Sequence, residues 1–266
     1  MQLGIGSYTL AWAVGVPGYA APSAPLEAEG LVEQASRLGV RVVQICDNLP
    51  LHLLPVERLD GLAARAGSAG VALEVGTRGT EPAHLLSYLR TASALGARLV
   101  RSLITKEVAA AERELLEVLP AYEKAGVVLA LENYERHGVR ALAELIQRIA
   151  SPCLGACLDT VNSLGALETP REAISALLPH TASLHLKDFD ITRNEHRLGF
   201  SVLGTPAGQG RLDIPELVNA ARNNGRDPNA ILELWTPYTG TVDDTVRKEM
   251  SWAEESISFL RRFIKS

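Results

Sequence analysis

The chain has 266 residues, of which 47% are hydrophobic and 21% charged, and its formal net charge is −5. This length suits one α/β barrel as a single domain, and the apolar content is ample for a buried core and argues against disorder. Acidic residues outnumber basic ones by 31 to 26, and no run of Lys and Arg accumulates, so nucleic-acid binding is not expected. We therefore expect a small neutral or anionic metabolite as the partner.

The first residues, MQLGIGSYTL, read as a strand and lack the basic segment, apolar stretch and cleavage site of a signal peptide. No apolar run is long enough to span a bilayer, so no membrane partner is expected. Cys46, Cys153 and Cys157 form neither a CxxC pair nor an even set, which favours reduced thiols over a disulfide or a zinc site. A cytoplasmic location is the expectation that follows.

Short runs rich in Val, Ile and Leu recur along the chain, each followed by turn residues and then by a longer stretch with helical spacing. This alternation predicts a parallel sheet. The expected strands are 3–8, 41–46, 72–77, 98–104, 127–132, 154–159, 182–187 and 230–235. Amphipathic segments lie between them, among them 25–39, 84–96, 110–126 and 139–150.

Glycine punctuates this pattern, because several helical segments end in Gly just before the next strand, at Gly39, Gly70, Gly96 and Gly126. Eight such β/α units predict a (β/α)₈ TIM barrel that spans residues 1–266 as a single domain. An open doubly wound sheet usually has fewer strands and would need a phosphate fingerprint, but GIGSYT (4–9) supplies only GxG.

One connection, at about 189–211 after the seventh expected strand, is much longer than the others and rich in glycine. Long loops inside a compact domain are usually functional. In a barrel this loop would fold over the carboxyl-terminal mouth, where active sites of the fold lie. A mobile surface insertion is the alternative.

Four side chains of metal-binding types mark the last four strands, namely Glu132, Asp159, His185 and Glu233. Their intervals of 27, 26 and 48 residues are one β/α repeat each, the third enlarged by the long loop. Any one of them alone would also fit the point where a strand meets water, but buried carboxylates without a partner are costly, so four together favour a bound cation. Three carboxylates and one imidazole predict one divalent ion, Mn²⁺, Mg²⁺ or Co²⁺.

The segments LALENYE (129–135), CLDTVNS (157–163), SLHLKDF (183–189) and ILELWTP (231–237) resemble the metal-bearing strands of the xylose isomerase-like TIM-barrel superfamily. GQGRLDIPEL (208–217) resembles its loop leading into the seventh helix, and the resemblance covers essentially the whole chain. That superfamily contains sugar isomerases and epimerases, and also metal-dependent dehydratases, decarboxylases and the endonuclease IV group.

The resemblance implies that Glu132, Asp159, His185 and Glu233 are the metal ligands, with Glu132 and Glu233 also acting as acid and base. One position departs from the pattern. Many ketose epimerases of the superfamily carry a histidine three residues after the sixth-strand aspartate, and this chain has Asn162 there. Asn162 therefore weakens the transfer of a particular epimerase chemistry and is a candidate substrate-binding residue.

Two basic residues lie beside these ligands. Lys187 shares its side of the strand with His185, and its ammonium either reaches a substrate oxygen or carboxylate, as a further catalytic group, or forms a surface salt bridge. Arg101 lies in an otherwise apolar strand and needs a partner, which is either a structural ion pair or a substrate anion.

Other neighbours have weaker assignments. Four aromatic residues flank the ends of the first and last strands, namely Tyr8, Trp12, Trp235 and Tyr238. They form either an apolar wall beside the substrate or part of the core. Asn133 and Glu135 are expected to orient Glu132. The loop histidines His52, His137 and His196 are expected to be solvated rather than catalytic.

The leading functional hypothesis is a metal-dependent isomerase or epimerase of a small ketose or related keto sugar, in which Glu132 and Glu233 move a proton through an enediolate. The alternative is a lyase of the same superfamily, a decarboxylase of a 3-oxo sugar acid or a dehydratase, in which Lys187 and Arg101 gain importance. A DNA-repair endonuclease is disfavoured by only 6 His and the negative charge, and a non-catalytic scaffold by the complete ligand set. A homo-oligomer is one open possibility.

Overall fold

The computed structural model describes residues 1–223, 225 and 227–265. Eight parallel strands close a barrel in the order β1-β10-β7-β6-β5-β4-β3-β2, which confirms the predicted TIM barrel. The barrel strands are β1 (Leu3–Gly6), β2 (Val42–Ile45), β3 (Ala72–Gly76), β4 (Leu99–Leu103), β5 (Val128–Glu132), β6 (Leu154–Asp159), β7 (Thr181–Leu186) and β10 (Asn229–Leu232).

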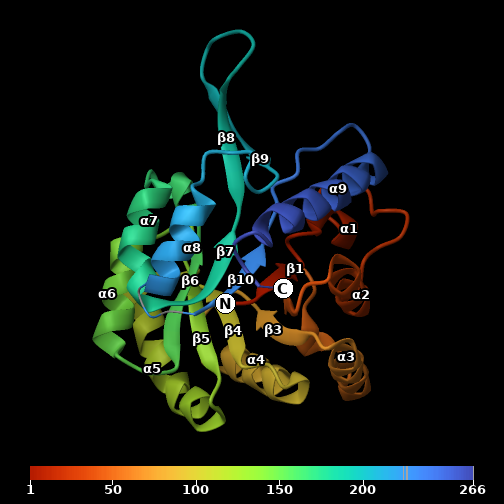
Figure 1. Cartoon of the computed structure of the whole chain (residues 1–266). Coiled ribbons are helices and arrows are strands. Elements are labelled where there is room, and N and C mark those ends of the chain that lie inside the picture. Colours follow the sequence, from red (N-terminus) through yellow and green to blue (C-terminus); the bar gives the residue numbers. More distant parts are fainter. Residues whose placement is uncertain (224, 226, 266) are drawn as a thin grey trace.

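Helices surround this barrel (Figure 1). They are the short α1 (Ala11–Val14), then α2 (Ala28–Leu38), α3 (Val56–Ala69), α4 (Pro82–Leu95), α5 (Val108–Ala125), α6 (Val139–Ile149), α7 (Pro170–Leu177), α8 (Ile214–Asn223) and α9 (Val242–Leu260). The four predicted capping glycines end α2, α3, α4 and α5 with φ between 64° and 66°, a conformation that glycine adopts without a Cβ penalty. Across the described residues, the helices are all too short or too polar to span a bilayer.

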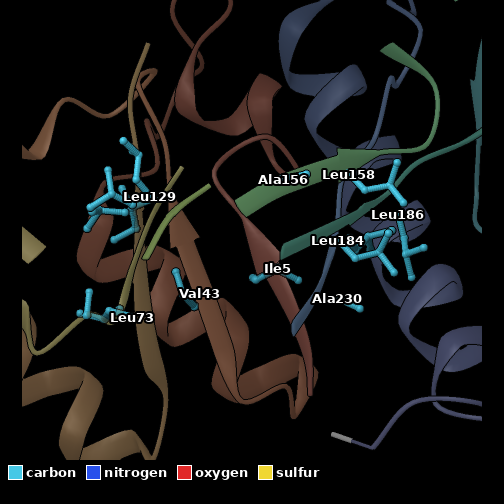
Figure 2. Packing of buried hydrophobic residues seen from close by; sticks show 14 of the residues in the cluster. Ile5, Val43, Leu73, Leu129, Ala156, Leu158, Leu184, Leu186 and Ala230 are labelled. Carbon is cyan, nitrogen blue, oxygen red and sulfur yellow. The ribbon is translucent and has the colours of Figure 1, made fainter. Parts of the chain in front are cut away.

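Side chains alternate between the two sides of each barrel strand. The outward ones are apolar and pack with the helices in one large buried cluster, as Figure 2 shows for Leu184 and Leu186 on either side of His185. Several inward positions carry polar groups instead, since Gln44 on β2 bonds across the barrel to His185 on β7 and also to Glu74 on β3. A small second cluster, formed by Leu99, Ala130 and Cys157, is apolar. The main hydrophobic core therefore lies between strands and helices, and a polar network occupies part of the barrel interior.

The connection 189–211, expected to be a long loop that folds over the carboxyl-terminal mouth, contains a hairpin instead. β8 (Asp188–Arg193) and β9 (Phe200–Thr205) pair antiparallel in a hairpin that projects from the barrel, with its tip clear of the other elements (Figure 1). It therefore does not fold back over the mouth. The two strands pair with each other instead of with the barrel, through six residue pairs from Asp188–Thr205 to Arg193–Phe200.

Each strand of this hairpin has close contacts at its base. The Asp188 carboxylate accepts hydrogen bonds from the backbone N–H groups of Phe189, Gly208, Gly210 and Leu212 at 2.9–3.1 Å. On β9, Gly204 lies so close to Trp235 that a Cβ at position 204 would stand 2.7 Å from the Trp235 Cβ. Both contacts hold the hairpin beside the end of β7.

A buried carboxylate joins the first and last helices. The two oxygens of Glu249, on α9, accept the backbone N–H groups of Trp12 and Ala13 at 3.0 and 3.1 Å. The Trp12 indole donates to the Thr236 carbonyl at 2.8 Å. α1 is too short to be stable alone, so these bonds fix the position of Trp12.

This contact predicts a pH dependence of stability. Burial raises the pKa of Glu249 to about 8, and the backbone N–H donors oppose that rise. Because a carboxyl group with a raised folded pKa binds its proton more tightly when folded, its contribution is present at low pH and lost as the pH rises through about 8. We expect the wild-type free energy of unfolding to fall, relative to Glu249→Gln, by roughly 3 kcal/mol between pH ~5 and ~8.

Urea denaturation of both proteins at several pH values measures this difference. Glu254→Gln changes an exposed carboxylate of the same helix and should follow the wild type at every pH. Parallel curves for the wild type and Glu249→Gln would contradict the prediction.

Candidate metal and substrate site

A pocket of about 290 Å³ lies at the carboxyl-terminal end of the barrel strands. Its walls come from residues at or just beyond the ends of the strands: Tyr8, Asp47, Arg78, Arg101, Leu103, Glu132, Tyr134, Glu135, Asn162, Gly165, Lys187, Glu233 and Trp235. A larger hollow around both chain termini contains none of the four predicted ligands. The smaller pocket is therefore the candidate site.

All four predicted ligands are buried and lie close together; Glu132 and Glu233 line this pocket, whereas Asp159 and His185 do not. His185 Nδ1 lies 3.2 Å from Glu233 Oε1, 3.5 Å from Glu132 Oε2 and 3.9 Å from Asp159 Oδ2. His185 Nδ1 and Glu233 Oε1 are enclosed without a hydrogen-bond partner. Buried lone pairs of this kind, converging from a mostly oxygen donor set, fit a divalent cation.

Local structure holds these ligands in place. The Asp159 Oδ1 accepts the backbone N–H groups of Val161 and Asn162, both at 2.8 Å. Asn133 was expected to orient Glu132, but its amide instead bonds the backbone of Asp159 on both sides, at 2.9 and 2.8 Å. Asp159 therefore presents Oδ2 to the other ligands.

Lys187 places an ammonium among the ligands. Its Nζ lies 2.9 Å from Asp159 Oδ2 and 3.0 Å from Glu233 Oε2, and it donates to Asn162 Oδ1 at 3.2 Å. Burial lowers the pKa of Lys187, but the carboxylates of Asp159 and Glu233 outweigh burial and raise it well above its usual value. Conversely, burial raises the pKa of Glu233, and the neighbouring His185 and Lys187 outweigh this effect and lower it. The ammonium thus supplies part of the positive charge that these carboxylates require.

Arg101 supplies more positive charge. Its Nε pairs with Glu132 Oε2, and its second nitrogen donates to Asp47 Oδ1 and to the Thr77 carbonyl, both at 3.0 Å. Arg101 thus forms the structural ion pair that was one of its two expected roles, and it also lines the pocket. The other oxygen of Glu132 accepts the Asn162 amide at 2.7 Å, so both Glu132 oxygens are occupied.

The predicted aromatic wall is divided. Tyr8 and Trp235 line the pocket, and the Trp235 ring centroid lies 4.8 Å from the Lys187 ammonium. Trp12 does not line it, because it packs against Tyr19 and Tyr238 with ring centroids 4.8 and 5.5 Å away. α1 turns its indole away from the pocket.

The loop histidines also lie outside the pocket walls. The ring of His52 bonds the Tyr88 hydroxyl at 3.0 Å, and that of His137 meets the Lys106 carbonyl at 2.8 Å. His196 lies in the connection between β8 and β9. None of the three lines the pocket, and the rings of His52 and His137 are bonded within the protein rather than solvated as expected.

Several pocket residues were missed by the sequence analysis. Asp47, Arg78 and Tyr134 each follow the end of a strand by two residues, a position that could have identified them as mouth residues. Arg78 is half exposed, and its Nε is 3.8 Å from Asp47 Oδ2, beyond hydrogen-bond distance. Of the pocket cations Arg78, Arg101 and Lys187, Arg78 therefore lies farthest from a carboxylate oxygen of the protein.

Comparison with known proteins identifies the family. Residues 27–263 match the family described as xylose isomerase-like TIM barrel, and the chain belongs to this family. It is 34% identical over 267 residues to a 3-oxo-isoapionate decarboxylase of Pectobacterium atrosepticum. The aligned region covers 98% of this chain and 95% of that protein.

Solved structures share the fold at low identity. A D-psicose 3-epimerase crystallised in the presence of D-fructose superimposes over 100% of both chains with a TM-score of 0.74 and 14% identity. A xylose isomerase-like protein of Mycobacterium smegmatis in complex with magnesium covers 97% of both chains with a TM-score of 0.70 and 15% identity. At this identity the likeness extends to the fold alone.

The position of Lys187 predicts a stability effect. In protein stripped of divalent ions, Lys187→Met should lower the free energy of unfolding by roughly 3–5 kcal/mol, because it leaves buried carboxylates without their cation. Excess Mn²⁺ should restore part of this loss, since an ion that binds only the folded state stabilises it.

Urea denaturation with and without Mn²⁺ measures both effects. Lys106→Met, which removes ion pairs with the more exposed Glu81 and Glu114, is the matched control and should cost less than about 1 kcal/mol. Equal losses in the two variants would refute the role given to Lys187.

Proposed function

We propose that this chain is a metal-dependent decarboxylase of a small 3-oxo sugar acid. The observation that carries the proposal is the state of the two candidate bases. Both oxygens of Glu132 are held by Arg101 and Asn162, whereas Glu233 keeps one oxygen without a hydrogen-bond partner. A reaction that needs a free base on each face of its substrate is poorly served by this arrangement, while loss of CO₂ needs none.

The decarboxylase that shares 34% of its sequence with nearly the whole of this chain supports the same choice. Its 3-oxo-isoapionate is a 3-oxo sugar acid, which is the substrate class we assign. A likeness of this extent, over an aligned length that includes every pocket residue, supports a shared reaction more strongly than the fold-level likeness to an epimerase.

We infer that Glu132, Asp159, His185 and Glu233 hold one divalent ion, Mn²⁺, Mg²⁺ or Co²⁺. When bound, such an ion would supply a Lewis acid for the 3-oxo group. The fit rests on the enclosed, unpartnered atoms His185 Nδ1 and Glu233 Oε1 and on the mainly oxygen donor set.

The chain's own residues account for the rest of the reaction. The bond from C2 to the carboxylate breaks, CO₂ leaves, its electron pair passes to the 3-oxo group, and C2 takes up a proton. Arg78 is the cation we assign to the substrate carboxylate, because its Nε is 3.8 Å from the nearest carboxylate oxygen, whereas Arg101 already pairs with Glu132 and Asp47.

Lys187 is the proton carrier we assign to C2. A lysine ammonium is protonated at neutral pH, and Lys187 lines the pocket. It contacts Asp159 and Glu233, which would also hold the proposed ion, so its ammonium lies beside the place where we expect the substrate to bind.

Isomerisation or epimerisation of a ketose is the second candidate, because Glu132 and Glu233 come from non-neighbouring strands and both line the pocket. It requires Arg101 and Asn162 to release Glu132. Exchange of substrate hydrogen with solvent, without release of CO₂, distinguishes it.

The proposal predicts stoichiometric CO₂ release. Mn²⁺-loaded protein should convert 3-oxo-isoapionate, or another 3-oxo acid of a four- or five-carbon sugar, to CO₂ and a ketose that carries one deuterium when made in D₂O. Chelation with EDTA and His185→Ala should each abolish turnover. Released CO₂ is measured by a coupled assay and the ketose by mass spectrometry. Deuterium exchange into ketoses such as D-psicose, with no CO₂ from any 3-oxo acid, would instead establish the epimerase.

The role of Arg78 predicts a selective effect on substrate binding. Arg78→Gln should raise KM for the keto acid about 10- to 100-fold, the equivalent of one charge-assisted hydrogen bond, with kcat changed much less. Arg136→Gln alters a nearby half-exposed arginine that does not line the pocket and should leave KM unchanged. Steady-state kinetics decide the matter, and a loss confined to kcat would reject this assignment.

A further inference from the structure

A chain of hydrogen bonds crosses the inside of the barrel beneath the site. The Asn229 amide donates to Glu74 Oε1 at 2.8 Å, and the Gln44 amide donates to Glu74 Oε2 at 2.9 Å. Gln44 Oε1 then meets His185 Nε2 at 2.7 Å. The four residues come from β10, β3, β2 and β7, and Gln44, Glu74 and His185 are buried.

The two amide donors give this hydrogen-bond chain its direction. Burial raises the pKa of Glu74, the hydrogen bonds from Asn229 and Gln44 oppose that rise, and an ionised carboxylate only accepts hydrogen bonds. Both oxygens of Glu74 receive an amide N–H, so the NH₂ group of Gln44 is turned toward Glu74. Its oxygen is thereby turned toward His185, where it requires a proton on Nε2. A histidine that binds a metal ion does so as the neutral imidazole, which carries one ring proton, so with that proton on Nε2 the Nδ1 atom has a bare lone pair.

That lone pair faces the site. Nδ1 is the His185 atom that lies 3.2 Å from Glu233 Oε1 and 3.5 Å from Glu132 Oε2. Without the chain, the opposite tautomer would be favoured, because a proton on Nδ1 could be donated to either carboxylate. An ion would then have to displace that proton before it could bind.

We propose that Gln44 and Glu74 are positioning residues that hold the proton of His185 on Nε2 and so keep Nδ1 ready for the metal ion. This inference rests on the proposed metal site, but not on the identity of the reaction. Neither residue touches the pocket, and they act only through His185. Partners of this kind commonly change metal affinity 10- to 100-fold when they are removed.

Exchanging the side chains of positions 44 and 74 tests the direction of the hydrogen-bond chain. In Glu74→Gln, the amide at position 74 can donate to Gln44 Oε1, which turns the NH₂ group of Gln44 toward His185 and favours the proton on Nδ1. In the double variant Gln44→Glu with Glu74→Gln, the carboxylate at position 44 accepts from His185 Nε2 and from the amide at position 74. Charge and volume are those of the wild type, and the direction is restored.

Two measurements report the position of the His185 proton and its effect on metal binding, the first on the metal-free protein and the second on its titration with Mn²⁺. The ¹⁵N chemical shifts of the His185 ring, assigned by comparison with His185→Gln, report which nitrogen carries the proton. Titration calorimetry gives the Mn²⁺ affinity. Glu74→Gln should move the proton to Nδ1 and weaken Mn²⁺ binding about 10- to 100-fold, and the double variant should return both to within a few-fold of the wild type.

Ser183→Ala is the matched control, since the Ser183 hydroxyl touches the Gln44 amide at 3.3 Å without setting its direction, and it should change neither measurement. Thermal unfolding shows that each variant is folded. A wild-type His185 that is protonated on Nδ1 or on both nitrogens would overturn the proposal, as would a folded double variant that stays as weak as Glu74→Gln. Because neither measurement uses substrate, failure to release CO₂ counts against the decarboxylase alone.

Discussion

The structure of the site depends on the balance between buried carboxylates and positive charge inside the barrel. Glu132, Asp159 and Glu233 are enclosed together, and carboxylates removed from water are stable only beside positive charge. Lys187 and Arg101 provide that charge from within the chain. The apolar sides of the same strands face the helices, so the main hydrophobic core lies outside the barrel. The buried charged groups of the site lie on the other side of the strands.

The sequence alone was enough for most of the fold, because its signals are local. All eight barrel strands lie within a residue or two of their predicted bounds, except that the last ends three residues early. Glycine marks the ends of the helices for the same reason, since a left-handed cap is decided by one residue. The β8–β9 hairpin escaped prediction because much of it faces water, with Phe200 61% exposed, so no buried face imposes a pattern.

The site was predictable where it depends on strand ends and unpredictable where it depends on closure of the barrel. Glu132, Asp159, His185 and Glu233 follow from strand spacing. Gln44 lies inside the apolar run RVVQIC, and its contact with His185 exists only because β2 and β7 face each other across the barrel. The partners of Arg101 and the direction of Trp12 likewise depend on tertiary contacts that no local pattern encodes.

The two anchored strands of the hairpin have a consequence for sequence divergence. One anchor, Asp188, directly follows Lys187, and the other, Gly204, rests on Trp235, so each fixes a residue of the pocket wall. Residues 190–203 between the anchors are mostly exposed and do not line the pocket, so we expect this part of the hairpin to tolerate changes of length and composition. At the two anchors we expect less tolerance, because each lies next to a residue of the pocket wall.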